Sequence, residues 1–291
     1  MLFFSAMHKI KKILDLVVTV ILWSAGAIMV FVLVQILLFA SFKIPTDSMQ
    51  PTIVPGDNIL VVKPLLGARL FNVPATLNGE AEEIKRIPGL CSFSRNDVLV
   101  FNNPIARNWD KIEFDVMKYF VKRCIAIPGD TLTIENGFYR VKGVTDTLGN
   151  LAAQLSLHQL PKNSIEKGLL NSLNGWTILD FGPLYVPRKD DEITISKANV
   201  QAYKRLIEYE TGKVISERDG LVYLDNNELH SYKVQQNYYF MGGDNVLNSQ
   251  DSRYWGPLPE SFIVGKAIWI WKSEDKQTGA MNWSRFFKRI S

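Results

Sequence analysis

An uninterrupted apolar segment near the N-terminus constrains this chain more than any other feature. Residues 16–42 contain no charged side chain. A helix needs about 20 apolar residues to cross the hydrocarbon core of a bilayer, whereas the apolar part of a cleaved secretory leader is usually about 7–15 residues long. The length therefore predicts a permanent transmembrane anchor, bounded as residues 13–42, and disfavours a cleaved leader or a buried core helix.

The charges that flank the anchor predict its orientation. Lys9, Lys11 and Lys12 precede it, while Lys43 and then Asp47 follow it. Basic residues are retained on the cytoplasmic side of a membrane. We therefore expect residues 1–12 in the cytoplasm and everything after Phe42 on the outer side of the membrane. The later apolar stretch 262–271 is too short to cross again and has the character of a strand.

Composition excludes several classes of protein. The chain is 47% hydrophobic and 21% charged, which favours a packed core. The net charge of +4 is mild and most basic residues are scattered, so no nucleic-acid partner is expected. Two cysteines, Cys91 and Cys124, cannot build a disulfide framework or a multi-cysteine zinc site, although a single bond between them stays open. The three histidines lie far apart, and we expect no metal and no other cofactor.

The remainder alternates short apolar runs with Gly/Pro turns, which predicts a mainly β, antiparallel fold. We assign a β core to residues 43–141 and 236–272, an inserted α+β subdomain to 142–235, and a basic C-terminal tail to 273–291. Within these parts we expect an irregular excursion over 64–96 and a helix over 198–209. The tail mixes aromatic and basic side chains, so it fits either a membrane-surface segment or a polar terminus with a few packed aromatic residues.

A nucleophile and a base are suggested by two short segments. Ser48 lies between Pro45 and Pro51, which stiffen the loop enough to present a side chain and a backbone N–H together. A serine in this setting more often only makes a turn. Lys122 lies in the apolar strand 119–127, where burial would lower its pKa and allow a neutral amine to take the serine proton. The alternative is a lysine whose head group reaches solvent.

A third segment, residues 242–256, is dense in Gly, Asn, Asp and Ser and predicts a hydrogen-bonded loop. Asp251 and Arg253 could form a structural ion pair within it. Alternatively, Asp244, Asn245 and Asp251 could bind calcium through their oxygens, although their spacing is not that of an EF-hand.

Taken together, four segments in this order behind an anchor resemble the conserved boxes of type I signal peptidases, the serine/lysine endopeptidases that remove leader peptides. The segments are PTDSMQPT (45–52), GDNILVVK (56–63), KRCIAIPGD (122–130) and GDNVLNSQDSRYWG (243–256). The resemblance implies a mostly antiparallel β catalytic core with an inserted domain. It also implies cleavage after small residues of the Ala-x-Ala type, with exported precursors, the lipid bilayer and the secretion machinery as partners. The reaction would take place at the outer, periplasmic face of a bacterial plasma membrane.

The resemblance also implies roles for individual residues. Ser48 would be the nucleophile and Lys122 the general base, with Ser249 orienting the amine. The Ser48 N–H and the Thr46 hydroxyl would form the oxyanion hole. The geometry would be held by Asp251 and Arg253, and shallow substrate pockets would be lined by Ile44, Met49, Ile53 and Phe120.

Other functions remain open at this point. A related serine/lysine peptidase could serve one dedicated precursor. A non-catalytic anchored β module would keep the fold without needing Lys122, and a calcium-binding adhesion module would use the loop at 244–253.

Overall fold

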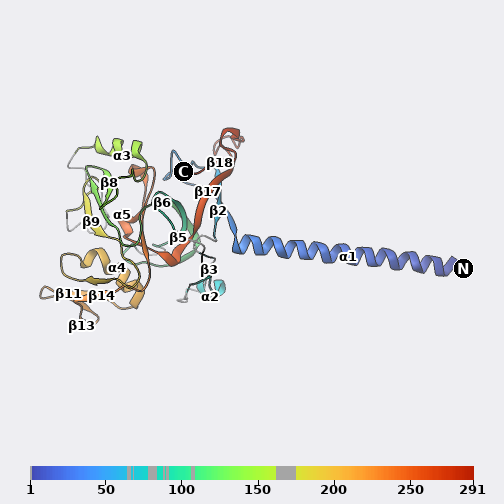
Figure 1. Ribbon diagram of the computed structural model, residues 1–291, viewed down its shortest axis with the longest axis horizontal. Helices are drawn as coiled ribbons and strands as arrows, with labels where there is room; N and C mark the ends of the chain where they lie inside the picture. The colour runs from blue at the N-terminus through green and yellow to red at the C-terminus, as the bar shows by residue number, and fades with distance from the viewer. Residues whose placement is uncertain are drawn as a thin grey trace.

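The structure is a computed structural model that describes residues 2–63, 67, 69–77, 84–87, 89, 92–105, 109–161 and 175–291. A long N-terminal helix, α1 (Leu2–Leu37), projects away from a β-rich body (Figure 1). Among the described residues, Lys11–Gln35 is the one segment long and apolar enough to cross a membrane. Its apolar side chains are exposed over an area that water-soluble proteins rarely leave uncovered. This agrees with the predicted anchor.

The helix ends before the expected boundary of the anchor at Phe42. Residues Phe39–Lys43 form strand β1, which pairs antiparallel with β2 (Asp57–Val62). The Phe42 side chain packs against the core, and its ring centre lies 4.9 Å from that of Tyr119. The last apolar residues of the run are therefore partly covered by protein. Composition alone cannot distinguish an apolar residue that packs against protein from one that contacts lipid.

The body is built on one large antiparallel sheet, which confirms the predicted mainly β class. Its described strands lie in the order β1-β2-β17-β5-β6-β15-β16, with β18 beside β17. Three strands separate β1 from β6 in this order, yet Phe42 of β1 contacts Tyr119 of β6. This contact shows that the sheet curves. The further strands are β5 (Val98–Asn103), β6 (Asp115–Ala126), β15 (Tyr238–Gly242), β16 (Leu258–Pro259), β17 (Ile263–Ser273) and β18 (Lys288–Arg289).

The elements expected in the inserted subdomain lie on the side of the body away from the anchor (Figure 1). They are α3 (Leu151–His158), β9 (Phe181–Tyr185), β10 (Glu192–Thr194), α4 (Val200–Thr211), β11 (Ile215–Arg218), β12 (Leu221–Leu224), β13 (Asn227–Glu228) and β14 (Ser231–Lys233). The expected helix is thus present as α4. The hairpin of β7 (Thr131–Glu135) and β8 (Phe138–Val141), which we assigned to the core, pairs with β9. The exact domain boundary stays a prediction.

The remaining elements are short. The region expected to be irregular, 64–96, lies partly outside the described residues and contains β3 (Arg69–Leu70), α2 (Val73–Leu77) and β4 (Lys85–Arg86). After β15 come η2 (Val246–Asn248), α5 (Ser252–Trp255), η3 (Glu260–Phe262) and, in the tail, η4 (Trp283–Arg285). Cys124 is buried with a free thiol, and Cys91 lies outside the described residues.

Candidate active site

Ser48 lies in the loop that joins β1 to β2, and the pairing of these two strands holds both ends of the loop. Met49 and Ile53 are buried and anchor the loop in the apolar core. The backbone N–H of Ile53 donates to the Met49 carbonyl at 2.9 Å, and that of Gln50 donates to the Asp47 carbonyl at 2.9 Å. The side chain of the half-buried Ser48 is therefore presented by a loop with little freedom to move.

Lys122 reaches this serine from the middle of β6. Its Nζ lies 2.5 Å from Ser48 Oγ, and the residue is only 5% exposed. Burial lowers the pKa of Lys122 from 10.5 to about 8, an effect that the charge of Asp251 partly opposes and that of Arg253 reinforces. The alternative of a solvated head group does not describe this structure. With this pKa, about a tenth of the amine is neutral at pH 7 and about half at pH 8.

The loop between β15 and α5 closes over the nucleophile segment. The Asn245 N–H donates to the Ser48 carbonyl at 3.0 Å, and the Asn248 side-chain amide donates to the Asp47 carboxylate at 2.9 Å. Gly243 permits this approach, because a Cβ at its position would lie 2.7 Å from the Ser48 carbonyl oxygen and 2.1 Å from Ser249 Oγ. A glycine is required here by close contact with its neighbours.

Asp251 and Arg253 form an ion pair inside this loop. Both are almost fully buried, and two guanidinium–carboxylate contacts of 2.8 and 2.9 Å join them. Burial alone would raise the pKa of Asp251, but the Arg253 charge and the hydrogen bonds outweigh it and lower that pKa. Arg253 also donates to the carbonyl oxygens of Val246 and Ser249, at 2.7 and 3.2 Å. The Asp251 carboxylate also accepts the N–H of Gly243 at 3.0 Å, so the pair ties the two ends of the loop together.

The calcium hypothesis for this loop finds no support in the geometry. Asp251 is engaged by Arg253, and Asp244 is engaged by Arg123 through two contacts of 2.7 Å. Carboxylates that already face guanidinium groups do not form an oxygen-lined cation site.

Ser249 and Thr46 line the same cavity as Ser48 and Lys122, as the resemblance implied. Ser249 is 6% exposed, but its hydroxyl has no hydrogen-bond partner among the described residues, so the expected bond to the Lys122 amine is absent here. Thr46 is exposed at the rim. Their expected roles in orienting the amine and in stabilising an oxyanion stay predictions.

The cavity beside the serine measures about 650 Å³ and is walled by the nucleophile loop, β1, β6 and the loop after β15. Ile44, Met49 and Phe120 line it, as expected for substrate contacts. Ile53 is not among the lining residues. It is fully buried in the core cluster that also contains Ile44 and Met49, so it supports the pocket from behind. Further lining residues that the sequence reasoning did not assign to the site are Tyr119, Leu247, Asn248, Gln250 and Tyr254.

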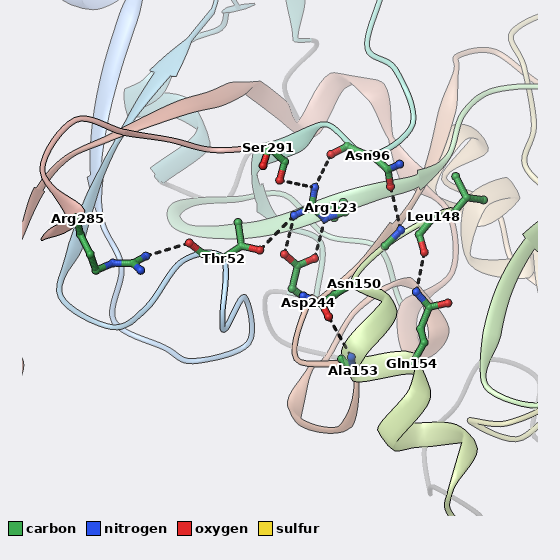
Figure 2. Close-up of polar contacts among 11 residues, drawn as sticks. Thr52, Asn96, Arg123, Leu148, Asn150, Ala153, Gln154, Asp244, Arg285 and Ser291 are labelled. Atoms are coloured by element: carbon green, nitrogen blue, oxygen red, sulfur yellow. Dashed lines mark hydrogen bonds and ion pairs between the residues drawn. The ribbon is translucent and has the colours of Figure 1, made fainter. Parts of the chain in front are cut away.

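Arg123, the residue that follows Lys122, was not among the expected site residues. Its side chain nevertheless joins four separate segments of the chain. Its guanidinium binds the Asp244 carboxylate and donates to the main-chain oxygens of Asn96 at 2.8 Å and Ser291 at 3.1 Å. A longer contact of 3.4 Å reaches Thr52 Oγ1 (Figure 2). The signal that could have found it is the alternation of strand side chains, which points adjacent cations to opposite faces of β6.

The arrangement as a whole is suited to nucleophilic attack by a serine hydroxyl. A lysine amine of lowered pKa lies within hydrogen-bond reach of that hydroxyl and can accept its proton. Both groups open onto a cavity large enough for several residues of a peptide. These are the requirements for forming and then hydrolysing an acyl ester.

Comparison with known proteins agrees with this chemistry. A signal peptidase I of Buchnera aphidicola subsp. Baizongia pistaciae is 28% identical over 266 residues, which cover 86% of this chain and 74% of that protein. The signal peptidase I of Pseudomonas aeruginosa is 29% identical over 258 residues, covering 84% and 69% of the two chains. That of Helicobacter pylori strain 26695 is 26% identical over 282 residues, covering 91% and 90%.

A solved structure of a signal peptidase I from Enterococcus faecalis shares 18% identity, with coverage of 60% of this chain and 96% of that one. Its TM-score of 0.30 is too low to carry an argument. The profile of the family described as "Signal peptidase, peptidase S26" matches residues 17–167 and 182–272, which include most of the anchor, Ser48, Lys122 and the loop after β15. On this match over most of its length, the chain belongs to the signal peptidase family, peptidase S26.

Proposed function

We propose that this chain is a membrane-anchored endopeptidase that removes N-terminal signal peptides from exported precursor proteins by a Ser48/Lys122 mechanism. The observation that carries the proposal is the 2.5 Å contact between Lys122 Nζ and Ser48 Oγ at the wall of a peptide-sized cavity. Membership of the signal peptidase family supplies the substrate class.

The chemistry proceeds through two half-reactions, and in each of them the Lys122 amine accepts one proton and later returns it. Lys122 accepts the proton of Ser48 as the hydroxyl oxygen attacks the scissile carbonyl, and the Ser48 N–H with the Thr46 hydroxyl stabilises the resulting oxyanion. The same amine then protonates the departing α-amino group of the mature protein, leaving the signal peptide as an ester on Ser48. A water molecule deprotonated by Lys122 hydrolyses the ester and restores the serine.

Substrate recognition is proposed to use the cavity walls. β1 is the terminal strand of the main sheet and lines the cavity with β6, so an extended peptide can lie beside strand backbone there. Ile44 and Met49 are buried, and with the half-buried Phe120 they leave only shallow apolar surface for side chains. This favours small residues at the first and third positions before the cut, as in Ala-x-Ala.

The position of the anchor supports a reaction at the membrane surface. Ser48 follows α1 after only one short strand, so the cavity lies close to the bilayer surface. With the basic residues before the anchor on the cytoplasmic side, the cavity faces the periplasmic side of the bacterial inner membrane. Exported chains leaving the secretion machinery would reach it there, and the lipid bilayer would surround α1.

The test is cleavage of a precursor that carries an Ala-x-Ala leader by detergent-purified full-length chain, with products identified by mass spectrometry. Wild type should cut after the last alanine, while Ser48→Ala and Lys122→Ala proteins should not. Cleavage by Ser48→Ala would exclude the proposed nucleophile. A folded wild type that cleaves only one dedicated precursor would favour a narrow-substrate peptidase, and one that cleaves none would favour a binding module.

A further inference from the structure

The C-terminal tail returns to the loop that carries the nucleophile. After β17 the chain turns back, and β18 pairs with the same strand through Trp269–Arg289 and Ile270–Lys288. Ile290, only 7% exposed, packs in the apolar cluster that contains Ile44, Met49 and Ile53. Residues far apart in the sequence thus share one core cluster beneath Ser48.

The strongest link between the tail and this loop is Arg285. Its guanidinium contacts both oxygens of the Asp57 carboxylate, at 2.6 to 3.2 Å, and donates to the Thr52 carbonyl at 2.9 Å. The Asp57 carboxylate is fully buried and also accepts the N–H of Val54 at 2.8 Å. One side chain of the tail therefore holds the second half of the nucleophile loop directly at Thr52, and indirectly at Val54 through the Asp57 carboxylate.

Thr52 is held from two directions. Arg285 binds its carbonyl, and Arg123, the neighbour of the catalytic lysine, reaches its hydroxyl at 3.4 Å (Figure 2). On the other half of the loop, the Asn245 N–H holds the Ser48 carbonyl. The serine is thus positioned by contacts on both sides, and Arg285 supplies the contact that comes from the tail.

We infer that Arg285 is a positioning residue for the reaction, because it holds the nucleophile loop at the distance at which Lys122 can take the Ser48 proton. The inference rests on the proposed serine/lysine mechanism. Displacement of a reacting group by about 1 Å can cost on the order of 10²-fold in rate. Arg285 does not line the cavity, so its loss should lower kcat and leave KM nearly unchanged.

The test compares full-length wild type with Arg285→Met, Asp57→Asn and the double variant, using the precursor assay and thermal melting of each protein. We expect Arg285→Met to lower kcat by about 10- to 100-fold, with KM within about threefold of wild type and the pH midpoint of kcat unmoved, since Arg285 is not among the groups that influence the Lys122 pKa. Asp57→Asn should lower kcat similarly. The double variant should lose little more kcat than either single variant, because both changes remove the same contact between Arg285 and Asp57. Arg289→Met, an exposed arginine of the same tail, is the matched control and should keep wild-type kcat.

Wild-type kcat in folded Arg285→Met, or a rise in KM equal to the loss of kcat, would overturn the inference. If Arg285→Met does not fold, Arg285→Lys decides. Lysine keeps the charge but lacks the planar fork that spans both partners, so it should lower kcat at constant KM, and wild-type kcat in this protein would show a purely structural role. Absence of cleavage by wild type would remove the proposed function and this inference together, whereas cleavage by wild type with full activity in Arg285→Met removes the inference alone.

Discussion

Two neighbouring basic residues of strand β6 point to opposite faces of the strand and meet different partners. Lys122 and Arg123 are almost equally buried, at 5% and 6% exposure. Lys122 meets the uncharged hydroxyl of Ser48, whereas Arg123 meets the Asp244 carboxylate in a two-pronged ion pair. Similar burial therefore produces a lysine of lowered pKa on one face and a structural ion pair on the other.

The difference shows that the partner, together with the chemistry of the side chain, decides what a buried cation does. An amine without a directly bound carboxylate can release its proton at moderate cost and so becomes a base. A guanidinium stays charged in proteins, and its planar fork matches a carboxylate, so it serves to join segments. Substitution of Lys122 should therefore mainly lower activity, and substitution of Arg123 should mainly lower stability.

We expect the greatest loss, a fall in kcat, when Lys122 becomes arginine. Lys122→Arg keeps the positive charge but cannot accept the serine proton, so we expect kcat to fall by about 10²- to 10⁴-fold, the usual contribution of a general base. Precursor cleavage followed by mass spectrometry measures this. Substantial turnover by Lys122→Arg would contradict the assignment of Lys122 as base.

The next effect is on stability when the ion pair on the opposite face is broken. Arg123→Met leaves the buried Asp244 carboxylate without its main partner and should destabilise the fold by about 3–5 kcal/mol. Thermal melting of the full-length protein in detergent measures the loss. The double variant Arg123→Met/Asp244→Leu should recover part of it, because no buried charge is left unpaired, and a double variant less stable than Arg123→Met would argue against this explanation.

A gain of stability is expected when Lys122 becomes methionine. The folded-state pKa of about 8 lies below the usual 10.5, so the folded protein binds the lysine proton less tightly than the unfolded chain does. This costs about 3 kcal/mol at pH values below 8. The cost diminishes as pH rises from 8 to 10.5 and is absent above that range. Lys122→Met should therefore melt higher than wild type at pH 7, with the difference shrinking in alkaline buffer, and equal melting temperatures at pH 7 would contradict the lowered pKa.

The mildest change concerns the unaltered protein: the rate of wild-type cleavage should depend on pH through Lys122. Because the base works only when neutral, kcat should rise with pH by about tenfold per unit below the Lys122 pKa and level off above about 8. A rate profile from about pH 6 to 10 tests this. A profile that is flat across this range would exclude the lysine as the group that controls activity.

Much of the fold was predictable because its signals are local. The anchor follows from an apolar run, and the helix expected over 198–209 is present as α4, whose spaced apolar residues, such as Tyr203 and Leu206, are buried. Helix α1 ends at Leu37, before the expected end of the anchor at Phe42, because the apolar residues of β1 satisfy a sheet as well as a bilayer. Ile53 was expected at the cavity wall, but alternation along a loop does not reveal which apolar side chains face the core.

Residue type and spacing were enough to predict the anchor, the mainly β class, and the serine, lysine and acidic loop as candidates for one site. Which of these groups meet depends on how the chain packs. The packing placed Lys122 on Ser48, left the Ser249 hydroxyl without a partner among the described residues, and joined Arg123 to Asp244 and Arg285 to Asp57. These pairings depend on the curvature and register of a sheet whose strands come from distant parts of the chain, and long-range geometry of this kind is not encoded in any local pattern.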